Sequence, residues 1–132
     1  MNVLFVCTGN TCRSPMAAGI FVHMYPQHAA KSAGLYTQDG LAASENAVEA
    51  VKSLDVDIST HVSSSIKNEL TDWADVVVAL AEYHVQVLHG MCQGKKVLLL
   101  GSGIDDPYGA DLEAYKECAF QIQSALEKLK LD

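Results

Sequence analysis

The sequence has little proline, few charged residues and no long apolar run. Of its 132 residues, 3 are proline and 19% are charged, whereas 49% are hydrophobic. This balance is typical of a folded chain rather than a disordered one, and the length predicts one domain over residues 1–132. The longest apolar runs, such as residues 76–81, are too short to cross a bilayer, so we expect no membrane partner.

Positive charge is also scarce. Lysine and arginine number 9 against 16 acidic residues, which gives a net charge of −7. A protein that binds the backbone of nucleic acids needs a basic surface, so we expect no nucleic-acid partner. A single bound phosphate group is compatible with this charge, because local amides and one arginine can hold it. The first residues lack the basic and apolar segments of a signal peptide, which predicts a cytoplasmic protein with reduced thiols.

The cysteines are few, and their spacing does not match a metal or thioredoxin-type site. Structural zinc sites need four ligands in close pairs, and thioredoxin-type sites need C-x-x-C. Four residues separate Cys7 from Cys12, and Cys92 and Cys118 stand alone on expected helices. We therefore expect no metal and no cofactor, and we interpret Cys92 and Cys118 as buried apolar residues.

Short apolar runs alternate with amphipathic segments along the chain. The pattern predicts strands over 2–6, 29–34, 75–81 and 96–100, and helices over 14–25, 44–54, 63–70, 82–92 and 111–129. In the first helix, we expect Ser14 as the N-cap and Pro15 at the first helical position. The alternation predicts an α/β fold: a single three-layer, doubly wound (Rossmann-like) domain around a four-stranded parallel sheet. Ligands of such sheets bind beyond the carboxyl ends of the strands, which is where the loop after the first strand lies.

That loop, "CTGNTCRS" at 7–14, has the residues of a phosphate site. Five residues between Cys7 and Arg13 suffice to turn backbone N–H groups around one anion, and the following helix points its positive end there. Arg13 offers two parallel donors to phosphoryl oxygens, and Ser14 can donate to the Cys7 sulfur. The predicted phosphate-binding residues are Thr8, Gly9, Asn10, Thr11, Cys12, Arg13 and Ser14. A merely buried Cys7 fits poorly, because polar residues follow it directly.

These residues resemble a known family. The motif C-x₅-R-S after an N-terminal strand, together with "SAG" at 32–34, "ADVVVAL" at 74–80 and "DDPYG" at 105–109, is similar to the low-molecular-weight protein tyrosine phosphatases and their bacterial arginine-phosphatase relatives. The resemblance covers nearly the whole chain. A phosphate-binding module without catalysis is the alternative from another class, and the intact Cys7, Arg13 and Asp106 argue against it.

The resemblance implies a hydrolase that acts on phosphorylated proteins and releases inorganic phosphate. Cys7 would form a phosphocysteine intermediate, Arg13 would stabilise the oxygens, and Asp106, before Pro107, would be the general acid and then the base. Asp105 is the neighbouring candidate for the acid.

The resemblance also implies roles around the pocket. Tyr108 would flank the substrate, and Leu35 and Tyr36 would form the opposite wall. Cys12 is a candidate redox partner that would form a disulfide with Cys7. His61 matches a family histidine, for which we expect a structural role.

Thr11 bears on the substrate. Tyrosine-specific members of the family usually carry isoleucine at this position, whereas arginine phosphatases carry threonine, and the glycine after Tyr108 follows the arginine-phosphatase pattern. Threonine leaves room and a hydroxyl for a polar phosphoguanidinium, whereas isoleucine suits a flat ring. We therefore expect a phosphoarginine phosphatase, with a tyrosine phosphatase as the alternative. An arsenate reductase is a weaker alternative, because it needs further cysteines on a mobile segment and only Cys92 lies near such a position.

Overall fold

The computed structural model describes residues 1–131, and its elements alternate as the sequence predicts. In chain order they are β1 (Asn2–Cys7), α1 (Arg13–Met24), β2 (Ala29–Gly34), α2 (Glu45–Lys52), α3 (Asn68–Trp73), β3 (Val76–Ala79), α4 (Glu82–Met91), β4 (Lys96–Leu99) and α5 (Leu112–Lys128). None of the helices in this described part is long and apolar enough to cross a membrane.

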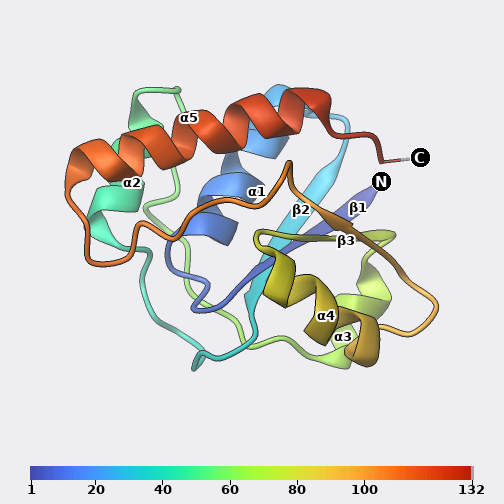
Figure 1. Ribbon diagram of the computed structural model, residues 1–132. Coiled ribbons are helices and arrows are strands. Elements are labelled where there is room, and N and C mark those ends of the chain that lie inside the picture. Colours follow the sequence, from blue (N-terminus) through green and yellow to red (C-terminus); the bar gives the residue numbers. More distant parts are fainter. Residues whose placement is uncertain (132) are drawn as a thin grey trace.

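The four strands form one parallel sheet in the order β2-β1-β3-β4. Helices α1, α2 and α5 cover one face, and α3 and α4 cover the other (Figure 1). The predicted fold class, a three-layer doubly wound α/β fold, is therefore confirmed. The chain leaves β1 toward β2 on one side and later places β3 on the other side of β1, so the connections diverge there. Such a switch point is where doubly wound sheets bind ligands.

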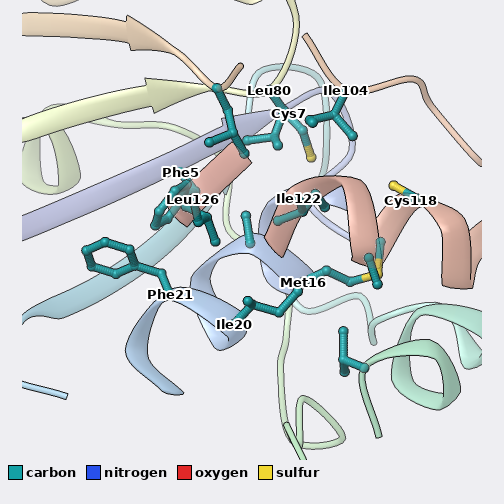
Figure 2. Packing of buried hydrophobic residues seen from close by; sticks show 14 of the residues in the cluster. Phe5, Cys7, Met16, Ile20, Phe21, Leu80, Ile104, Cys118, Ile122 and Leu126 are labelled. Atoms are coloured by element: carbon teal, nitrogen blue, oxygen red, sulfur yellow. The ribbon is translucent and has the colours of Figure 1, made fainter. Parts of the chain in front are cut away.

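Side chains along the central strands alternate between two cores. Val3, Phe5 and Cys7 of β1 face the core beneath α1 and α5, whereas Leu4 and Val6 face the core beneath α3 and α4. Figure 2 shows the first core, in which Phe5 and Phe21 lie close together and their ring centroids are 5.4 Å apart. Burial of both faces explains why the strand sequence is uniformly apolar. It also fixes the side of the sheet on which Cys7 lies.

The predicted helix over 63–70 is wrong for residues 63–67. Residues 63–67 are extended beside the end of β2, where Gly34 N–H donates to Ser64 O (2.8 Å) and Ile66 N–H donates to Gly34 O (2.9 Å). Helix α3 begins only at Asn68. Serine has modest helix propensity, and these backbone groups find partners outside a helix, so the tertiary contacts decide the conformation.

The predicted start of the first helix is also wrong by one to two residues. Cys12 is the N-cap and α1 begins at Arg13, so Ser14 does not cap the helix and Pro15 is the third helical residue. Proline is still tolerated there, because the first-turn N–H groups have no partner within the helix. The Ser14 hydroxyl is free for a different contact, with the Cys7 sulfur.

The burial of the two remaining cysteines agrees with the prediction. Cys92 follows α4 and Cys118 lies within α5, and both side chains are buried.

Candidate active site

The loop between β1 and α1 turns its carbonyl groups outward. Leu35 N–H donates to Cys7 O (3.0 Å), Tyr36 N–H donates to Thr8 O (3.0 Å) and Ser44 N–H donates to Thr11 O (2.9 Å). None of the described peptide bonds is cis, and in a trans peptide the N–H of the next residue points opposite to the carbonyl. The N–H groups of Thr8, Gly9 and Cys12 therefore point to the inside of the loop, where they form a concave set of donors for an anion.

Asn10 holds this loop from within. It is fully buried and adopts a left-handed conformation with φ 57°, which asparagine tolerates better than most residues. Its Oδ1 accepts from Ser64 N–H (2.8 Å), and its Nδ2 donates to Ser14 Oγ (2.7 Å). His61 Nε2 donates to the Asn10 carbonyl (2.8 Å), so His61 has a structural contact with the loop, as expected.

The Cys7 sulfur lies at the base of the loop and receives two hydrogen bonds. Ser14 Oγ is 2.9 Å from Cys7 Sγ, and Asn10 N–H donates to the same sulfur over 3.3 Å. Because Ser14 Oγ already accepts from the Asn10 amide, its own proton is available for the sulfur. Both contacts and the N-terminal end of α1 therefore converge on the sulfur from the same side as the loop amides.

Arg13 is buried and held from three directions. Its Nη1 donates to Ile104 O (2.9 Å), its Nη2 donates to Tyr83 Oη (3.1 Å), and the same Nη2 lies 3.5 Å from Asp106 Oδ2. Burial lowers the pKa of Arg13, whereas the hydrogen bond with Tyr83 raises it. The carboxylate of Asp106 raises it further, so the net pKa lies above its ordinary value and the guanidinium stays charged.

Asp106 faces both the solvent and the loop. Its Oδ1 accepts from Tyr108 N–H (3.1 Å), an ordinary turn contact, while Oδ2 is the oxygen nearest to Arg13. The side chain is 47% exposed, so a proton can reach it from water. The fold thus brings Asp106 to the loop, although more than 90 residues separate it from Arg13 in the sequence. Within residues 1–131, Asp105 forms no ion pair with Arg13.

These side chains surround a pocket of about 250 Å³. Its lining consists of Cys7, Thr8, Gly9, Thr11, Cys12, Arg13, Asp106 and Tyr108. The predicted residues Asn10 and Ser14 lie behind this lining and support it. Leu35 and Tyr36 are not part of the lining; their backbone binds the loop, and Leu35 packs on the core beneath α3 and α4. Their role as a pocket wall stays a prediction.

Cys12 also lines the pocket, as a free thiol. Its sulfur lies 3.3 Å from Tyr115 Oη. Burial, and next the hydrogen bond with Cys12, raises the pKa of Tyr115 to about 12, so the phenol is neutral at physiological pH. A disulfide between Cys7 and Cys12 stays a prediction, since both are free thiols in this structure.

The sequence did not predict two residues of the site, Tyr83 and His84. They stand in the first turn of α4, directly beyond the carboxyl end of β3, and the Thr8 hydroxyl contacts both: Tyr83 Oη at 3.0 Å and His84 Nε2 at 2.9 Å. In the sequence they read as ordinary residues of an amphipathic helix. Their position after a central strand was the only available signal.

His84 is fully buried, and its Nδ1 has no hydrogen-bond partner within residues 1–131. Burial, and next the positive charge of Arg13, lowers the pKa of His84 from 6.5 to about 4. The imidazole beside Thr8 is therefore neutral at physiological pH.

Comparisons with known proteins agree with this geometry. The family model "Low molecular weight phosphotyrosine protein phosphatase" matches residues 2–131. A protein-arginine-phosphatase of Bacillus subtilis is 34% identical and matches over 98% of this chain and 94% of its own. An arsenate reductase of Staphylococcus aureus is 33% identical, over 98% and 96% of the two chains. The crystal structure of a low molecular weight protein tyrosine phosphatase from T. tengcongensis superimposes with a TM-score of 0.91 at 40% identity, over 97% and 96% of the chains.

The lowered pKa of His84 predicts a pH dependence of stability. Below its ordinary pKa of 6.5 the unfolded chain takes up a proton at this residue, whereas the folded chain does so only near pH 4. Stability is therefore fully present above pH 6.5 and is lost as the pH falls toward about 4. Between about pH 7.5 and 5.5 the free energy of unfolding should fall by about 1 kcal/mol through this residue.

Urea denaturation at both pH values checks this. His84→Gln should remove the part of the pH dependence that comes from His84. His23→Gln, at an exposed position, should leave that part unchanged. An equal pH dependence in His84→Gln and the unchanged protein would contradict the assignment.

Proposed function

The chain belongs to the low molecular weight phosphotyrosine protein phosphatase family, and we propose that it hydrolyses phosphoarginine in proteins through a phosphocysteine on Cys7. As a member of this family the protein is a cysteine-dependent phosphoprotein phosphatase. The observation that carries the substrate assignment is Thr11 in the lining of the pocket. The arginine-phosphatase relative from Bacillus subtilis, which matches nearly full length, supports it.

In the first step, the Cys7 thiolate attacks phosphorus and the bond from phosphorus to the leaving nitrogen breaks. The phosphoryl oxygens are held by the inward N–H groups of the loop and by Arg13, which stabilise the charge in the transition state. Asp106 donates a proton to the departing nitrogen, so the arginine side chain leaves as a guanidinium and not as a strongly basic guanidine. The products of this step are the dephosphorylated arginine side chain and the phosphocysteine.

In the second step, water attacks the phosphocysteine and the phosphorus–sulfur bond breaks. Asp106, now a carboxylate, accepts the proton of the water. Cys7 leaves as a thiolate, which Ser14 Oγ and Asn10 N–H stabilise at 2.9 Å and 3.3 Å. Inorganic phosphate is released, and the site returns to its starting state.

Thr11 supports phosphoarginine over phosphotyrosine through its size and its hydroxyl. Its Oγ1 lies 3.7 Å from the position that a Cβ atom on Gly9 would occupy. The two residues therefore border the same part of the pocket. Isoleucine at position 11 would fill this part with apolar atoms and remove the hydroxyl. A flat phenyl ring gains from such a wall, whereas a polar guanidinium loses a partner.

Two other activities of the family are the alternatives. A tyrosine phosphatase would use the same chemistry, and the structural relative at 40% identity carries that name. An arsenate reductase would need accessible cysteines to relay a disulfide. Here burial raises the pKa of Cys118 to about 12 and also raises that of Cys92, so both are poor thiolates. The environment of these cysteines favours the phosphatase.

Asp106→Asn tests the general acid. The amide cannot donate the proton, so kcat on phosphoarginine should fall by about 10²–10⁴-fold. The loss should be smaller for p-nitrophenyl phosphate, whose leaving group needs less protonation. Steady-state kinetics on both substrates checks this, with Asp105→Asn as the matched neighbour. If Asp105→Asn did more damage than Asp106→Asn, the acid would be the preceding residue.

Thr11→Ile tests the substrate. It should lower kcat/KM on a phosphoarginine peptide by a larger factor than it raises kcat/KM on a phosphotyrosine peptide, because a lost polar contact costs more than the roughly 10–200-fold that an added methylene contributes. The control is Thr60→Ile, which adds the same atoms at an exposed position outside the pocket. If the unchanged protein preferred phosphotyrosine, or if Thr11→Ile left the ratio of the two kcat/KM values unaltered, the protein would instead be assigned as a tyrosine phosphatase.

A further inference from the structure

We propose that Tyr83 is a positioning residue, which holds Arg13 and Thr8 of the phosphate loop in the orientation that binds phosphoryl oxygens. The proposal rests on the proposed function and extends it to a residue outside the phosphate loop. Tyr83 is not among the residues that line the pocket. It therefore acts through its two partners rather than by contact with the substrate.

The first contact fixes the plane of the guanidinium. Arg13 has five N–H groups, of which one on Nη1 goes to Ile104 O and one on Nη2 goes to Tyr83 Oη. Two such contacts at different nitrogens determine the orientation of a planar group. The three remaining N–H groups, on Nε and on each terminal nitrogen, include the pair that a bidentate phosphate contact requires.

Within residues 1–131, the contact that Nη2 keeps without Tyr83 is the one with Asp106 Oδ2, at 3.5 Å. That carboxylate is exposed, and its proposed role requires it to carry a proton in the first step, when its charge disappears. The phenol of Tyr83 takes no part in the proposed proton transfer, so its hydrogen bond with Arg13 does not depend on whether Asp106 carries a proton. Tyr83 therefore restrains the Arg13 guanidinium throughout the reaction, whereas the restraint from Asp106 changes with its protonation.

The second contact ties the same phenol to the loop. Arg13 donates to Tyr83 Oη, so the proton of the phenol is free for Thr8 Oγ1, which is 3.0 Å away. Thr8 Oγ1 is also 2.9 Å from His84 Nε2, so the hydroxyl is held on two sides. One phenol oxygen thus joins the first residue of the loop to the arginine at its end.

Tyr83 itself has a rigid support, although its side chain is half exposed. Its ring lies against the imidazole of the fully buried His84, with centroids 4.1 Å apart and planes inclined by 56°. The residue belongs to the first turn of α4, which follows β3 at the switch point of the sheet. The ring contact remains when the hydroxyl alone is removed, so Tyr83→Phe tests the two hydrogen bonds and not the packing.

The first measurement is the affinity for inorganic phosphate by calorimetry, which does not depend on the identity of the substrate. Tyr83→Phe should weaken phosphate binding by about three- to tenfold, the usual effect of lost hydrogen bonds, and should raise KM more than it lowers kcat. The matched control is Tyr25→Phe, which removes a phenol oxygen that donates to Leu126 O at 3.4 Å, away from the loop.

The second measurement uses the fact that Arg13 is the only arginine in the chain. With ¹⁵N-labelled arginine, NMR gives one guanidinium without the need for assignment. In the ligand-free protein, Tyr83→Phe should speed the rotation of this group, whereas Tyr25→Phe should leave it as in the unchanged protein. If Tyr83 had only a structural role, the guanidinium rotation would change only together with the melting temperature. Faster rotation at an unchanged melting temperature therefore indicates a positioning role.

Phosphate affinity of Tyr83→Phe within twofold of the unchanged protein would overturn the proposal, and so would an unaltered guanidinium signal. Failure of the unchanged protein to bind phosphate at all would instead contradict the proposed function, and the positioning role would fall with it. The two failures are therefore distinguishable in the same titration.

Discussion

The candidate site depends on the hydrogen bonds of one buried residue, Asn10. Its backbone N–H reaches the Cys7 sulfur, its carbonyl accepts from His61, and its amide group spans Ser64 and Ser14. Buried polar groups are costly when left unpaired, so the four contacts fix the left-handed turn of the loop at this residue. The outward carbonyls and inward N–H groups of the loop follow from that turn.

The topology of the sheet decides what surrounds the loop. Because β3 lies next to β1, the first turn of α4 meets the loop that follows β1, and Tyr83 reaches Arg13. The segment after β4 then brings Ile104 and Asp106 to the same guanidinium. A protein with a net charge of −7 can bind an anion in this way, because one buried arginine and the oriented peptide groups determine the local field.

Features that depend on local sequence were predictable, and those that depend on distant contacts were not. The apolar central strands β1 and β3, the left-handed Asn10 and the contact of Ser14 with Cys7 follow from residue type and spacing. Residues 63–67 were predicted as helical, because the sequence does not show that their backbone pairs with Gly34 and Asn10. Tyr83 and His84 were missed for the same reason, since their partner Thr8 is 75 and 76 residues away. The loop also lies so close to Gly34 that a Cβ atom there would be 2.8 Å from Thr8 O. This close approach likewise depends on the fold and could not be predicted from the sequence.

Both steps of the proposed reaction require that the phosphoryl group passes through the Cys7 sulfur. The most direct test is to denature the enzyme rapidly during turnover of a phosphoarginine peptide and to locate the phosphate by peptide mass spectrometry. We expect a phosphoryl group on Cys7 and on no other cysteine. A phosphorylated residue elsewhere, such as Cys12, or turnover with no phosphorylated enzyme at any quench time, would contradict it.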